Sequence, residues 1–228
     1  MVNIEAFQQL RAKFESTKTT LVAVSKMKPA ESVKALYDLG QRDFGENYVQ
    51  ELVEKQALLP NDIQWHFIGH LQSNKVKYIA PFVHLIQGVD SFKLLQEINK
   101  QAQKNSRTIS CLLQIHIANE ETKFGLDEKE LLETLEYYTA QQASMANVKI
   151  CGLMGMASFS DDEQQVVAEF KNLNSLFHLA KQSYFLGNPD FNILSMGMSG
   201  DYDLAIAEGA THVRIGSLLF GRRSLPIQ

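Results

Sequence analysis

Short apolar runs alternate with longer amphipathic runs along this chain. Amphipathic stretches with helical spacing separate runs that have the length and composition of buried strands. The strand-like runs span residues 21–26, 43–47, 64–71, 84–89, 110–118, 148–156, 192–198 and 212–216. The helix-like stretches span residues 29–39, 48–58, 74–80, 91–104, 128–142, 161–182 and 202–208. About eight strand–helix units are what a (β/α)8 barrel of the TIM type needs, so the pattern predicts this α/β fold.

Residue types at the ends of several runs support the predicted helices. Ser91 precedes an apolar-periodic run, as an N-cap residue does. Gly40 follows Leu39, where a helix C-cap is expected. After Asp161, apolar residues recur every three to four positions, which predicts an amphipathic helix packed on the barrel. A further helix over residues 4–14 is expected to close the bottom of the barrel.

Length, charge and cysteine content narrow the possible classes of protein. The 228 residues fit one barrel domain over residues 1–228 better than two small domains. A formal net charge of -4 argues against a broad nucleic-acid surface, which needs clustered lysine and arginine. No apolar run is long enough to span a membrane. Cys111 and Cys151 lie in apolar runs without metal-ligand spacing, so we expect buried free thiols in a cytoplasmic protein.

Lys26 is the first candidate for chemistry, because it ends the apolar run that starts at Leu21. In a parallel barrel, functional side chains collect where the strands end. A charged residue that terminates a buried strand is costly unless it is used, and a lysine amine can form a Schiff base with an aldehyde. Side chains two apart share a strand face, so Val22, Val24 and Lys26 share one face. Lys26 and, on the last strand, Arg214 are expected to point into the barrel mouth.

A phosphate-binding signature lies towards the other end of the chain. Residues 195–201 (Ser-Met-Gly-Met-Ser-Gly-Asp) and 213–217 (Val-Arg-Ile-Gly-Ser) each place two small residues, Ser199-Gly200 and Gly216-Ser217, at a predicted strand-to-helix turn. Backbone amides at such turns wrap a phosphate, and barrels often bind one after strands seven and eight. The candidate ligands are Ser199, Gly200, Gly216 and Ser217. An aldehyde and a phosphate on one ligand suggest pyridoxal phosphate.

Other candidate residues carry weaker signals. A metal site is not predicted, because His66 and His70 lie four apart on a strand and have no evident third ligand. The Arg214 side chain has two possible roles: a hydrogen bond to the pyridine nitrogen of the cofactor, or a salt bridge across the barrel top. A hydrogen bond from arginine would keep that nitrogen unprotonated and make the ring a weaker electron sink.

Along nearly its whole length the chain resembles the pyridoxal phosphate homeostasis proteins, the YggS/PROSC family. The matching stretches are residues 22–26, 44–51 (FGENYVQE), 65–69 (WHFIG), 71–75, 123–125, 152–154, 195–199 and 213–216. The resemblance implies a single barrel like the N-terminal, pyridoxal-phosphate-binding domain of alanine racemase. It also implies a binding site for the cofactor, which Lys26 holds as an aldimine, Asn47 lies beside, Arg214 meets at the ring nitrogen, and Ser199, Gly200, Gly216 and Ser217 grip by the phosphate.

The resemblance favours one function and leaves two others open. Family members are regarded as carriers or regulators of vitamin B6 pools without established turnover, which implies a non-enzymatic carrier that serves pyridoxal-phosphate-dependent apo-enzymes. We expect it to be a cytoplasmic monomer. The first alternative is a racemase or lyase acting on amino acids, with Lys123 or His66 as acid or base. The sequence shows no second, β-rich domain that would supply the opposing base of a racemase. The second alternative is a Schiff-base aldolase acting on a sugar phosphate.

Overall fold

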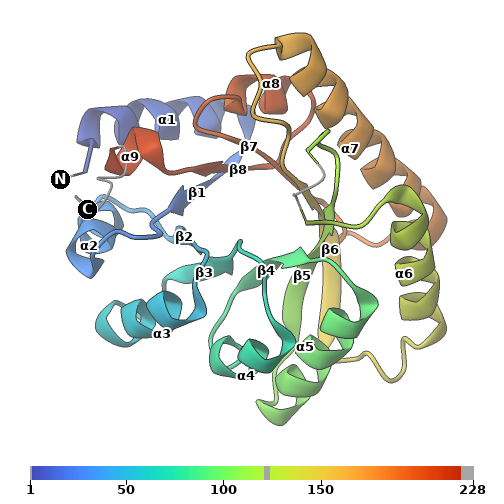
Figure 1. Ribbon diagram of the computed structural model, residues 1–228. Helices are drawn as coiled ribbons and strands as arrows, with labels where there is room; N and C mark the ends of the chain where they lie inside the picture. Colours follow the sequence, from blue (N-terminus) through green and yellow to red (C-terminus); the bar gives the residue numbers. More distant parts are fainter. Residues whose placement is uncertain (1, 121–123, 222–228) are drawn as a thin grey trace.

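The computed structural model describes residues 2–120 and 124–221 and contains a closed parallel barrel (Figure 1). Its strands follow the order of the chain, and β1 closes the ring by pairing with β8. The strands are β1 Thr20–Val24, β2 Asp43–Glu46, β3 Gln64–Phe67, β4 Leu85–Val89, β5 Ile109–Ile115, β6 Val148–Gly155, β7 Ile193–Met198 and β8 His212–Ile215. The predicted (β/α)8 fold is therefore confirmed.

Helices cover the outside of the barrel (Figure 1). They are α1 Ile4–Thr17, α2 Ala30–Asp38, α3 Val49–Leu58, η1 Ser73–Lys75, α4 Val76–Ile79, α5 Phe92–Lys104, α6 Glu128–Ala140, α7 Glu163–Tyr184, α8 Tyr202–Ala207 and α9 Ser217–Phe220. The predicted caps are confirmed, since the Ser91 side chain accepts from the Leu94 amide and Gly40 has a left-handed φ of 98°. In the part of the chain that the structure describes, no helix combines the length and apolarity needed to cross a bilayer.

The first helix was expected to close the bottom of the barrel, but it does not. Phe7, Leu10 and Phe14 of α1 are buried and recur on one face, so the helix lies along the barrel wall. The amide of Asn3 donates to the Leu219 carbonyl of α9 (2.8 Å), and Figure 1 shows α1 beside β1 and α9. The helix thus takes the place in the outer ring that the four-residue α9 leaves open.

Several predicted boundaries differ from those of the structure, such as the strand over residues 110–118, which is Ile109–Ile115. The run over residues 64–71 leaves the sheet after Phe67, and a side chain at Gly69 would lie 2.4 Å from the Asn47 carbonyl oxygen. The predicted helix over residues 74–80 is a 3-10 turn followed by a single helical turn. The first strand ends at Val24, so Lys26 lies in the turn that follows β1.

The barrel interior contains both apolar and polar side chains. Leu85, Leu112, Cys151 and Met154 form a small apolar cluster inside it. The strands also carry buried polar side chains, among them His66, Gln87, Gln114, Ser195 and Arg214. Both cysteines are buried and free, as the sequence analysis predicted. The buried polar groups need hydrogen-bond partners, and their partners lead to the candidate site.

Candidate functional site

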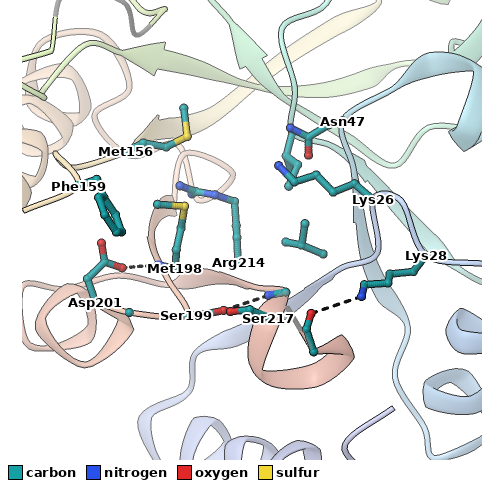
Figure 2. A pocket seen from close by; sticks show the side chains of 15 residues that line it. Lys26, Lys28, Asn47, Met156, Phe159, Met198, Ser199, Asp201, Arg214 and Ser217 are labelled. Carbon is teal, nitrogen blue, oxygen red and sulfur yellow. Dashed lines mark hydrogen bonds between the residues drawn. The ribbon is translucent and has the colours of Figure 1, made fainter. Parts of the chain in front are cut away.

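A cavity of about 470 Å³ opens at the carboxyl ends of the strands. Residues from both ends of the sequence meet there, because strand ends converge at one rim of a parallel barrel. The cavity lining includes all seven residues that the sequence analysis singled out: Lys26, Asn47, Ser199, Gly200, Arg214, Gly216 and Ser217. In Figure 2, Lys26 and Asn47 enter from one side, while Ser199 and Ser217 lie across the cavity.

Asn47 directly follows β2 and carries an unused hydrogen-bonding atom. Its Oδ1 is buried and has no hydrogen-bond partner among the residues that the structure describes. Buried polar atoms are rarely left without a partner, because an unpaired one costs about 1–3 kcal/mol. A bound ligand with a hydrogen-bond donor near this wall would satisfy the atom.

The turns after β7 and β8 are joined to each other. The amide of Gly216 donates to Oγ of Ser199 (3.2 Å), which links the start of α9 to the end of β7. A Cβ at Gly216 would lie 3.3 Å from the Val24 carbonyl oxygen, so a larger residue would crowd β1. A Cβ at Gly200 would meet open space, so glycine is not required there for lack of room. The arrangement presents a hydroxyl and the first amides of α9 to the cavity, which suits an anion.

Arg214 forms the buried floor of the cavity. Its Nη1 donates to Oγ of Ser195 (2.7 Å), and its Nη2 donates to the carbonyl of Gly155 (2.9 Å). Burial lowers the pKa of Arg214 to about 10, while the Asp201 carboxylate acts in the opposite direction. The guanidinium therefore remains charged at neutral pH and donates hydrogen bonds only.

A row of hydrogen bonds continues from Arg214 through Ser195 into the barrel interior. The hydroxyl of Ser195 donates to Oε1 of Gln87 (2.7 Å), and Nε2 of Gln87 meets Nδ1 of His66 (2.9 Å). Nε2 of His66 then lies 2.9 Å from Oδ1 of Asp43. An amide nitrogen can only donate, so His66 accepts at Nδ1 and donates from Nε2. Every bond in this row, the Arg214–Asp43 row, points from Arg214 towards Asp43.

This row changes how His66 is interpreted. From the sequence, His66 is a possible acid or base, but its ring is buried in the barrel interior and is not part of the cavity lining. The other candidate, Lys123, lies outside the described residues. A sequence signal for the row did exist: Gln87 and Ser195 are polar residues inside otherwise buried strands, where each needs a partner.

The cavity also contains residues that the sequence analysis did not single out. Lys28 donates from Nζ to the Phe220 carbonyl (2.8 Å), which ties the loop after β1 to the end of α9. Phe159, after β6, lies at the cavity with its side chain fully exposed (Figure 2). Within residues 2–120 and 124–221, no group of three His, Cys, Asp or Glu side chains is placed to hold a metal ion.

Comparisons with known proteins show what the chain is similar to. Residues 4–224 match the family model described as alanine racemase, N-terminal domain. The pyridoxal phosphate homeostasis protein of Aquifex aeolicus (strain VF5) is 41% identical over 204 residues, which cover 89% of this chain and 86% of the relative. The human protein of the same name is 41% identical over 216 residues, covering 89% of this chain and 76% of the relative.

A solved structure of a relative has the same fold as this chain. The structure of PipY of Synechococcus elongatus PCC7942, with pyridoxal phosphate bound, has a TM-score of 0.83 and 35% identity. The match covers 95% of this chain and 99% of PipY. By sequence and by fold, the chain belongs to the pyridoxal phosphate homeostasis protein family.

Proposed function

We propose that this protein binds pyridoxal phosphate in the cavity, covalently through Lys26, and serves pyridoxal phosphate homeostasis. One observation carries the proposal: a lysine amine, an unpaired amide oxygen and the two joined turns after β7 and β8 line a single cavity. PipY, a relative with the same fold, has a solved structure with this cofactor bound. The residues present fit the chemistry of the group, since it brings an aldehyde and a phosphate.

Each residue has a distinct part in this proposal. Lys26 would hold the group covalently through Nζ, and the group would supply the aldehyde carbon for this attachment. Ser199, Gly200, Gly216 and Ser217 hold the phosphate with amides and hydroxyls. Arg214 donates a hydrogen bond to the ring nitrogen, and Asn47 offers its unpaired Oδ1 to a donor on the ligand.

The chemistry of Arg214 favours storage over turnover. The cofactor supplies an electron-withdrawing ring, and that property is strongest when the ring nitrogen is protonated. A guanidinium that remains charged at neutral pH can only donate hydrogen bonds, so it cannot accept one from a protonated ring nitrogen. The ring nitrogen beside it therefore stays unprotonated. We therefore propose a carrier without catalytic residues, acting as a cytoplasmic monomer that passes the cofactor to apo-enzymes. The free, buried thiols of Cys111 and Cys151 suit a reducing compartment.

Absorbance and chemical trapping test this function. Pyridoxal phosphate is added to the purified protein, the visible spectrum is recorded, the adduct is reduced with borohydride, and peptides are mapped. We expect a visible band and a reduced adduct on Lys26, both lost in Lys26→Ala. Lys129→Ala is the matched control, because that side chain is 83% exposed on α6.

Other results would overturn the proposal. Absence of any band or adduct in the wild-type protein would exclude pyridoxal phosphate as the ligand. An adduct that persists in Lys26→Ala would exclude Lys26 as the attachment site. Steady turnover of an amino acid that depends on Lys26 would show an enzyme, and a trapped adduct with a sugar phosphate alone would show an aldolase.

A further inference from the structure

The turn that carries Lys26 is bonded to a buried lysine and a buried glutamate. Nζ of Lys55 donates to the carbonyl of Ser25 (2.7 Å). The hydroxyl of Ser25 donates to Oε1 of Glu46 (2.6 Å), and Nζ of Lys55 also donates to that oxygen (2.6 Å). The residue before Lys26 is thereby fixed through both its backbone and its side chain.

The residue after Lys26 is fixed by a second glutamate. The amide of Met27 donates to Oε1 of Glu51 (2.7 Å), and Nζ of Lys55 donates to the same oxygen (2.7 Å). Met27 has a φ of 60°, in the left-handed region that is unfavourable for a non-glycine residue. Such a conformation persists only where surrounding contacts enforce it, and the bond to Glu51 is one such contact.

Glu46, Glu51 and Lys55 form one charged cluster, here called the turn clamp. Glu46 ends β2, while Glu51 and Lys55 lie one helical turn apart on α3. Lys55 and Glu46 are 5% and 0% exposed. Burial raises the pKa of Glu46, and the neighbouring Lys55 acts against this rise. Within the described part of the chain, Oε2 of Glu46 is buried and has no hydrogen-bond partner.

The turn clamp is expected to add little to the free energy of unfolding. Desolvation of a buried ion pair offsets most of its attraction, and apolar residues of similar volume often stabilise a protein as well or better. None of the three residues lines the cavity. Their contacts converge instead on the two neighbours of Lys26, which points to a role in conformation.

We propose that Glu46, Glu51 and Lys55 are positioning residues that hold the turn over residues 25–27, so that the amine of Lys26 projects into the cavity. The inference rests on the proposed function, because it assigns the turn clamp a part in covalent attachment. It makes a separable claim: the turn clamp governs the rate at which Lys26 attaches, while the phosphate turns after β7 and β8 govern reversible binding.

The test measures two quantities on the same folded proteins. The first is the rate constant for formation of the borohydride-reducible adduct with pyridoxal phosphate. The second is the affinity for pyridoxine 5′-phosphate, which has the ring and the phosphate but no aldehyde. In Lys55→Met, we expect the rate constant to fall about 10- to 100-fold, since small misplacement of a reacting group has effects of this size. The affinity for pyridoxine 5′-phosphate is expected to change by less than about twofold.

Lys34→Met is the matched control for Lys55→Met. Lys34 pairs with Asp38 four residues later on α2, which is the same spacing as Glu51 and Lys55, but on an exposed surface. This variant is expected to keep both the rate constant and the affinity. Glu51→Gln retains an oxygen that accepts from the amide of Met27, whereas Glu51→Ala does not. We therefore expect attachment to be slower in Glu51→Ala than in Glu51→Gln.

The outcomes separate the inference from the proposed function. Wild-type protein that forms no adduct would remove the proposed function and the inference with it. Wild-type protein that attaches, together with variants that attach at the same rate, would overturn the inference alone. Parallel losses in attachment rate and in pyridoxine 5′-phosphate affinity would show general disruption and would also overturn it. If Lys55→Met does not fold, the comparison of Glu51→Gln with Glu51→Ala decides, since Glu51 is 21% exposed.

Discussion

Acidification is expected to destabilise this barrel through His212, the first residue of β8. Burial lowers the pKa of His212 from 6.5 to about 4, with His66, His84 and Arg214 acting in the same direction and Asp43 against it. Between about pH 6.5 and pH 4, this ring is therefore protonated in the unfolded chain but neutral in the folded chain. Stability supplied by the neutral ring is complete above about pH 6.5 and is lost as the pH falls towards 4.

The size of the effect follows from the difference in pKa. A shift from 6.5 to about 4 spans roughly 2.5 units, and each unit is worth about 1.4 kcal/mol. At about pH 4.5 the loss from this ring alone is therefore about 2.5 kcal/mol. That is a large share of the roughly 5–15 kcal/mol by which a domain is usually stable.

Urea unfolding from about pH 7.5 to about pH 4.5 measures this loss. Carboxylates also titrate in this range, so the wild-type curve is compared with that of His212→Asn. We expect the variant to lose about 2.5 kcal/mol less than the wild type over the interval. His178→Asn, on the exposed side of α7, is expected to follow the wild type. Parallel curves for the wild type and His212→Asn would refute the reasoning.

Two further substitutions test the packing and the polar interior. Phe191→Ala removes a fully buried ring that stacks on Phe185 (4.3 Å) and Phe177 (5.0 Å), so we expect a loss of about 3–5 kcal/mol in urea unfolding; a loss below about 1 kcal/mol would contradict this estimate. Gln87→Leu leaves the facing atoms of Ser195 and His66 unpaired, so we expect a loss of at least about 2 kcal/mol, and an unchanged unfolding midpoint would contradict that view of the Arg214–Asp43 row.

The sequence predicted the barrel because every strand run carries the same signal. Short buried runs such as Leu85–Val89 leave little choice but a parallel sheet covered by helices. Strand ends then meet at one rim, which is why Lys26 and Ser217 were placed in one site although 191 positions separate them. The role of α1 was harder to predict, because a buried helical face does not say which surface it covers.

Side-chain partners were beyond what the pattern could show. Glu51 and Lys55 have a spacing that usually marks an exposed pair on a helix, and nothing in their type distinguishes a buried pair. In the structure both residues bond to the loop after β1, Lys55 at the carbonyl of Ser25 and Glu51 at the amide of Met27. Phe159 is fully exposed beside the cavity, a placement that its apolar character alone would not predict.

The site straddles the seam where β1 meets β8. Lys26 comes from one side of this seam, and Arg214 and Gly216 come from the other. The bond from Lys28 to Phe220 joins residues 192 positions apart, which is among the most non-local contacts that a chain of this length can make. The cavity therefore exists only after the ring has closed. A ligand held across the seam lowers the population of every opened form by mass action, so retention of the ligand and closure of the ring are linked equilibria.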